Sequence, residues 1–180
     1  MNRARALIFF ACLCAPAASM AQTAAAPTQA QARELSNYLK SRAADLNRTS
    51  GHLTAMFQAS ANSATPDTVQ QRYSDTLWIG MVLETSHVAL KSIDDLVLSA
   101  LLYSVMKCEF DRRVARLTLL EQVKEYIDYV DGPGADMDGE IVGLSVPAES
   151  LESMKLRDTI QEIRDRLSKF APPAAKATGD

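Results

Sequence analysis

The stretch that decides the fold of this protein is residues 92–130, SIDDLVLSALLYSVMKCEFDRRVARLTLLEQVKEYIDYV. It contains no Pro or Gly, and nine of the eleven positions from Leu96 to Met106 are apolar. A helix that is apolar on nearly every side belongs in the interior of a domain, because no face of it is suited to water. We therefore expect the remaining helices to pack around this stretch.

The flanking segments show helical apolar spacing of their own. Leucines repeat every seven residues between residues 31 and 60, as in helices that pack along a seam. Thr65-Pro66-Asp67 is a helix start signal, with a capping residue, a Pro at the first helical position and an acid in the first turn. Residues 147–170 place apolar side chains in a 4-3-4-3 rhythm. Since no segment alternates like a strand, the sequence predicts an all-α fold, an up-down four-helix bundle.

Two helix boundaries determine how this bundle is divided. Residues 92–95 have the Ser-x-x-acid spacing of a capping box, and we expect a turn there, because one helix from Pro66 to Val130 would be about 97 Å long. The charged segment 107–116 predicts a break in the third helix near Cys108, which would make five helices. Residues 131–146 begin with Asp-Gly-Pro-Gly and lack clear periodicity, so they are predicted to form a long loop.

The expected core takes one apolar row from each predicted helix. Its members are Leu35, Leu39, Leu46, Leu53, Leu77, Met81, Leu83, Val97, Leu101, Val105, Leu120, Ile160, Ile163 and Leu167. A single polar strip on the second helix is expected to face solvent. It consists of Tyr73, Thr76, Gly80, Glu84, His87 and Lys91.

The ends of the chain predict export. Residues 1–21 resemble a cleaved signal peptide, with two arginines, an apolar run and a small-residue cleavage site. Cys12 and Cys14 raise lipid attachment as an alternative, although the residues before Cys12 fit that pattern only at Ala11. Residues 22–32 read as a flexible leader, 33–170 as the bundle domain, and 171–180 as a disordered tail. We expect a periplasmic or secreted protein.

Charge and cysteine content limit the possible partners. Cleavage after residue 21 leaves 17 basic and 22 acidic side chains, a net charge of −5. Without a basic patch, neither nucleic acid nor an anionic membrane surface is an expected partner. Cleavage also leaves Cys108 as the single cysteine, so no internal disulfide framework is expected.

Two short patterns suggest a divalent metal. Glu84 and His87 have the Glu-x-x-His spacing of di-iron bundles, but a second copy is missing. Asp136 and Asp138 fit the third and fifth positions of an EF-hand loop, yet the pattern fails at both ends. We therefore expect these four side chains to be exposed to solvent and to bind no cofactor. The alternative is that they bind a divalent cation.

Cys108 has three interpretations. It lies seven residues after Leu101 on the same helical face, which favours a small buried side chain. An intermolecular disulfide is the second interpretation, because the compartment is oxidising. A catalytic thiol is the third, although no histidine partner is evident.

No catalytic constellation accompanies these features. The chain lacks a Gly-x-Ser-x-Gly elbow and a phosphate-binding Gly-rich loop. The leading hypothesis is therefore a non-enzymatic protein that binds another envelope protein, or a second copy of itself, through a helix face or the 131–146 loop. The alternative hypothesis is a bundle that binds a small ligand or a divalent metal.

Overall fold

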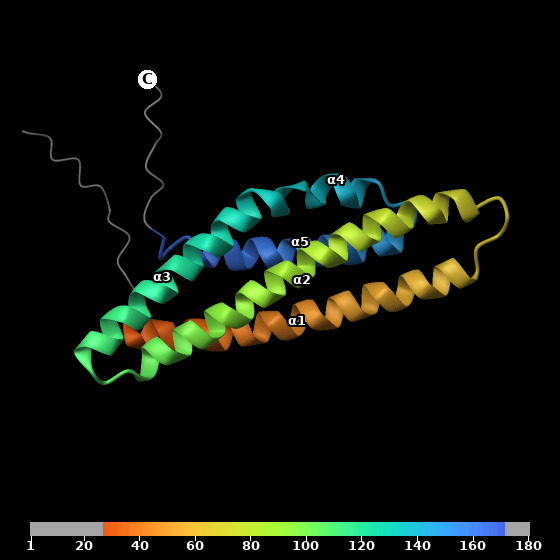
Figure 1. Ribbon diagram of the computed structural model, residues 1–180. Coiled ribbons are helices and arrows are strands. Elements are labelled where there is room, and N and C mark those ends of the chain that lie inside the picture. The colour runs from red at the N-terminus through yellow and green to blue at the C-terminus, as the bar shows by residue number, and fades with distance from the viewer. Residues whose placement is uncertain (1–26, 172–180) are drawn as a thin grey trace, which may run out of the picture.

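Four long helices make up most of the fold (Figure 1). They are α1 (Gln29–Asn62), α2 (Val69–Val105), α3 (Glu109–Asp131) and α5 (Pro147–Leu167). The 3-10 turn η1 (Pro133–Asp136) and the short helix α4 (Met137–Val142) join α3 to α5. The computed structural model describes residues 27–171, and no strand occurs within that range. The expected signal peptide and residues 172–180 of the expected tail lie outside the described residues.

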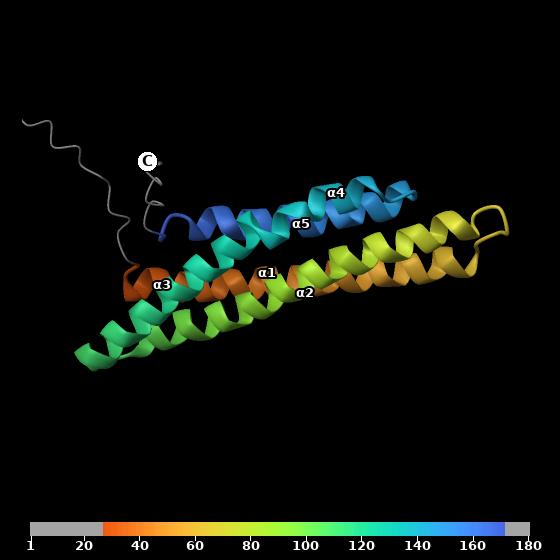
Figure 2. The same ribbon diagram turned by 45° about the horizontal axis from the view of Figure 1, so that its top comes forward.

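The long helices alternate in direction, as in an up-down bundle (Figures 1 and 2). α1 packs against α2 and α5, and α3 packs against the same two helices from the opposite side. The hairpin of α2 and α3 extends past the end of α5, so α5 does not cover its tip (Figures 1 and 2). The predicted all-α four-helix bundle is confirmed.

The first helix begins earlier than predicted because a capping box closes its end. The Thr28 side chain accepts a hydrogen bond from the Gln31 backbone N at 3.2 Å, and the Gln31 side chain accepts one from the Thr28 backbone N at 2.8 Å. This reciprocal pairing satisfies two backbone donors that a helix end would otherwise leave open. Residues 29–32 of the expected leader therefore belong to α1.

The predicted turn near Ser92 is wrong. α2 runs through it as one helix of 37 residues, and the Ser92 hydroxyl donates to the Val88 carbonyl one turn back instead of capping a new helix. The next residue, Ile93, is fully buried. At 1.5 Å per residue α2 is about 55 Å long, close to about 51 Å for α1, so the two helices can pair along their whole length. The predicted break near Cys108 is confirmed, since α2 ends at Val105 and α3 begins at Glu109.

The core rows of α1 and α5 are confirmed, whereas the row predicted for α2 is wrong. Leu77 and Met81 are 60% and 44% exposed, Leu101 and Val105 are also exposed, and Leu83, Val97 and Leu120 are half-buried. α2 instead buries a neighbouring row: Ile79, Val82, Ala89, Ile93, Leu96, Ala100 and Tyr103. Because α2 is apolar on several sides, its contacts with α1, α3, α4 and α5 select the buried face. The predicted polar strip of α2 is exposed.

The connection between α3 and α5 is mostly helical, which corrects the predicted loop at 131–146. Met137 and Ile141 of α4 are 2% exposed and join the core, while Val142 is 84% exposed. Gly143 follows the last residue of α4 and lies against the Trp78 indole. A residue with a side chain would not fit here, because its Cβ would come within 2.7 Å of the ring. No helix between residues 27 and 171 has the length and apolar content needed to cross a membrane.

Candidate functional site

The four residues considered for a metal do not come together. Glu84 and His87 lie on the exposed face of α2, and the exposed Asp138 makes an ion pair with Arg157 of α5. Across residues 27–171, no group of three or more His, Cys, Asp or Glu side chains could hold a metal ion. The geometry therefore gives no support to cation binding at these residues.

One residue from each predicted pair does lie near a third carboxylate, Glu140. Glu140 is 6% exposed, and its Oε2 has no hydrogen-bond partner. Burial raises the pKa of Glu140, and the negative charges of Asp136 and Glu84 raise it further. The raised pKa means that the charged form of Glu140 is disfavoured at this position.

A buried ion network lies where the α1–α2 hairpin meets the start of α5. Arg72 donates from both Nη atoms to the two carboxylate oxygens of Glu149 at 3.0 Å, and from Nη1 to Asp75 at 2.7 Å. Both carboxylates are almost fully buried, at 0% exposure for Asp75 and 1% for Glu149. The Arg72 guanidinium also lies over the Phe57 ring, 4.9 Å from its centroid.

Two serines complete the network from neighbouring segments. The Ser60 hydroxyl of α1 donates to Glu149 and accepts from Arg72. The backbone N and hydroxyl of Ser145 both donate to Asp75. The network thus ties α1, α2, the α4–α5 connection and α5 together. Its signal in the sequence is the i,i+3 spacing of Arg72 and Asp75, which does not distinguish a buried pair from an exposed one.

Cys108 is exposed in the turn between α2 and α3. The interpretation as a small buried side chain is therefore wrong, and its supposed neighbour on that face, Leu101, is exposed as well. The helix breaks just before Cys108, which removes the helical register on which that interpretation depended. The intermolecular disulfide and the reactive thiol stay predictions.

The tip of the α2–α3 hairpin carries a large group of exposed apolar side chains. This α2–α3 apolar patch consists of Leu98, Leu101, Leu102, Val105, Phe110, Val114 and Leu117. Phe110 is the most exposed member, at 73%. A groove of about 340 Å³ runs between the two helices within the patch. It is lined by Ser99, Leu102, Met106, Phe110, Asp111, Val114, Ala115 and Thr118. Exposed apolar surface of this kind is typical of interaction sites.

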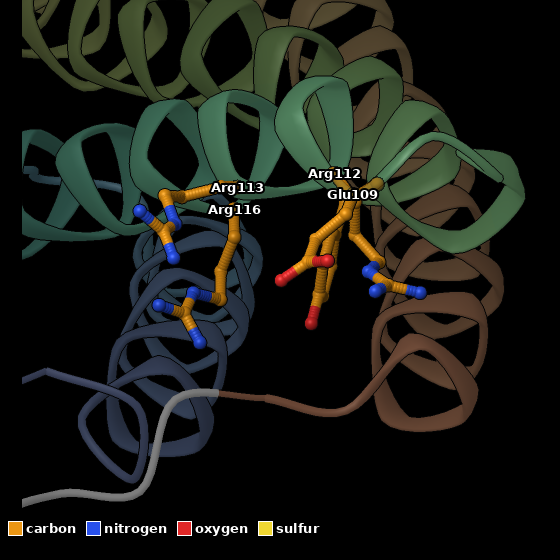
Figure 3. A pocket seen from close by; sticks show the side chains of 5 residues that line it. Glu109, Arg112, Arg113 and Arg116 are labelled. Carbon is orange, nitrogen blue, oxygen red and sulfur yellow. The ribbon is translucent and has the colours of Figure 1, made fainter.

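A second hollow lies on the other side of α3. This arginine cavity has a volume of about 170 Å³ and is lined by Tyr103, Glu109, Arg112, Arg113 and Arg116 (Figure 3). Arg113 and Arg116 project from α3 into the space between the start of α1 and the end of α5, and Arg112 extends toward α1 (Figure 3). The Glu109 side chain lies between them (Figure 3). The hollow is therefore strongly basic on an otherwise acidic protein.

The α2–α3 apolar patch and the arginine cavity were not predicted from the sequence. Leu101 and Val105 were expected in the core, and residues 107–116 were expected only to break the helix. The signal present in the sequence was the clustering of three arginines just after that break. No protein-family model matches the chain, and comparisons with curated proteins and with solved structures give no match.

Proposed function

We propose that this is an exported, non-enzymatic binding protein of the bacterial envelope, which docks an amphipathic helix of another envelope protein on the α2–α3 apolar patch. The observation that carries the proposal is the patch itself, with seven exposed Leu, Val and Phe side chains, of which Leu102, Phe110 and Val114 line one groove. Helix-in-groove recognition uses such surfaces, with apolar side chains of the partner spaced three and four residues apart.

The size of the patch fits a moderate affinity. Fully burying one Leu, Val or Phe side chain contributes about 1.5 to 3 kcal/mol. The seven members are 37% to 73% exposed, so their burial offers roughly 5 to 10 kcal/mol. Association itself costs on the order of 4 to 15 kcal/mol. The apolar contacts thus need polar support from the rim of the patch.

Three acidic side chains border the patch, whereas Arg113 lies beside Phe110. We take the acidic side chains as the feature that defines the chemistry of the partner. Asp95, Asp111 and Glu121 are exposed beside the patch, and among the described residues none of them forms an ion pair. A helix with an apolar stripe and a basic flank complements this rim, and such complementarity favours fast and specific association. In a symmetric dimer the same surfaces face one another, so two acidic rims would repel.

A labelled amphipathic peptide tests the proposal directly. One peptide carries leucines on one helical face and lysines along its flank, and a second replaces the lysines with glutamates. We expect the lysine peptide to bind in fluorescence anisotropy and the glutamate peptide to bind at least tenfold more weakly. Phe110→Ser should weaken binding about tenfold or more, because exposed aromatic anchors dominate such interfaces.

The matched control is Leu77→Ser, at a position 60% exposed on the other half of α2. Both substitutions are at exposed sites, so each should leave the free energy of unfolding within about 0.5 kcal/mol of the wild type. Equal binding of both peptides, or equal losses from the two substitutions, would overturn the proposal. A dimer in sedimentation that Phe110→Ser dissociates would instead assign the patch to a second copy.

A further inference from the structure

The arginine cavity contrasts with five arginines elsewhere in the described residues. Arg42, Arg48, Arg72, Arg157 and Arg164 each make an ion pair with a carboxylate. Arg112, Arg113 and Arg116 converge on one hollow, and in residues 27–171 no carboxylate oxygen lies within 4.0 Å of their guanidinium nitrogens. Three guanidinium groups thus line one hollow with a single carboxylate, that of Glu109, and no described ion pair.

The position of these arginines on α3 is itself unfavourable. α3 begins at Glu109, so all three lie within about its first two turns. The helix macrodipole places partial positive charge in the first turn, which disfavours a cation at Arg112. The three arginines also repel one another. A bound anion would reduce this repulsion, because it attracts all three guanidinium groups.

One of the arginines that line the cavity has an unsatisfied donor. Arg116 Nε is buried and has no hydrogen-bond partner. Arg42 and Arg72 have a similar unpartnered Nε, but their Nη atoms bind carboxylates. Arg116 differs from them because its guanidinium has no described ion pair. An oxyanion in the cavity would accept charge-assisted hydrogen bonds from this guanidinium.

Hydrogen bonds fix one wall of the cavity, where the end of α2 meets the start of α1. The Tyr103 hydroxyl donates to the Pro27 carbonyl at 2.8 Å. The Gln29 side-chain amide donates to the carbonyls of Tyr103 and Met106, at 2.9 and 2.8 Å. These contacts hold the start of α1 against the end of α2. A volume of about 170 Å³ holds several waters at roughly 30 Å³ each, which is enough for a tetrahedral oxyanion.

We propose that the arginine cavity binds a phosphate group, either as free phosphate or as the phosphomonoester of a lipid headgroup. Arg113 and Arg116 hold its oxygens from one side and Arg112 from the other. Guanidinium groups suit this ligand because their planar donors match phosphate geometry bidentately. Glu109 is the internal competitor, since its carboxylate lies among the arginines (Figure 3) and repels an incoming anion. The ligand therefore displaces Glu109 from the centre of the cavity.

Calorimetric titration with inorganic phosphate is the first test. We expect binding that weakens at least tenfold in Arg113→Gln and in Arg116→Gln, and that strengthens several-fold in Glu109→Gln. Arg33→Gln is the matched control, because Arg33 is an exposed arginine at the start of α1, outside the cavity. If Arg33→Gln weakens binding as much as Arg116→Gln, the effect is one of net charge and the proposed site is refuted.

Vesicle sedimentation separates the two sources of the phosphate. Phosphatidylcholine vesicles with and without phosphatidic acid are mixed with the wild type, Arg116→Gln and Phe110→Ser. Binding that requires both phosphatidic acid and Arg116 supports a lipid phosphomonoester, whereas phosphate binding in calorimetry without vesicle binding supports the free ion. Vesicle binding that survives Arg116→Gln but is lost in Phe110→Ser would overturn the site, as would a failure to bind either probe. Unchanged melting temperatures of the variants confirm that each result reports binding.

Discussion

Replacing Arg72 by Met tests whether the buried ion network holds the hairpin of α1 and α2 onto α5. Met preserves most of the side-chain volume and its contact with Phe57 but removes the positive charge. Asp75 and Glu149, at 0% and 1% exposure, would then face each other's charge without a cation. The serines that donate to them would remain as their only polar partners among the described contacts.

The expected cost follows from this geometry. Removing one partner of a buried ion pair typically costs about 3 to 5 kcal/mol, because the partner left behind is charged and desolvated. A cost near 4 kcal/mol corresponds to a fall in melting temperature of about 10 °C for a domain of this size. In a Glu149→Gln background only one buried carboxylate is left unpaired, so the cost of Arg72→Met should fall by about 1 to 2 kcal/mol.

Urea unfolding followed by circular dichroism measures these values. The control is Arg48→Met, which removes an ion pair with Asp45 from a side chain that is 77% exposed. Exposed pairs contribute about 0 to 1 kcal/mol, so this variant should stay close to the wild type. Two results would show that the network does not stabilise the junction. One is a loss of unfolding free energy in Arg72→Met no larger than in Arg48→Met. The other is a loss from Arg72→Met that is the same with and without Glu149→Gln.

Two further predictions concern α4. Glu140→Gln should stabilise the protein near neutral pH, because the raised pKa of Glu140 means that its charged form opposes folding. That advantage should shrink as the pH falls through the unfolded-state pKa of Glu, about 4.3, and be lost below it, where Glu140 is protonated in both states. A gap that grows on acidification would contradict this prediction. Gly143→Ala should lower the free energy of unfolding by about 1 to 3 kcal/mol, because the new Cβ would approach the Trp78 ring to 2.7 Å. It should also change the fluorescence of Trp78, the single tryptophan of the chain. Gly139→Ala meets nothing within 4 Å and should be neutral or stabilising by up to about 1 kcal/mol. Equal effects of the two alanines in urea unfolding would contradict a role for Trp78.

The exposed tip shows why the candidate sites could not be read from the sequence. Leu101 and Val105 belong to a segment that is apolar at nine of eleven positions, so hydrophobicity alone placed them in the core. They are exposed because α2 buries a neighbouring row of side chains, Ala100 and Tyr103 among them, and so turns this face outward. The arginines of α3 mark a cavity only because α1 and α5 flank the same space (Figure 3).

The sequence by itself determined the helical class, the break near Cys108 and the buried rows of α1 and α5. Each depends on local periodicity or on a local change in charge, which act over a few turns of one segment. The tertiary structure alone decided which face of α2 is buried, that α2 continues through Ser92, and that Arg72 meets Glu149 across 77 residues of chain. These outcomes depend on packing between distant segments. A helix that is apolar on several sides can bury more than one face, and a charged side chain at helical spacing can be buried or exposed. Only the neighbouring segments decide between these environments.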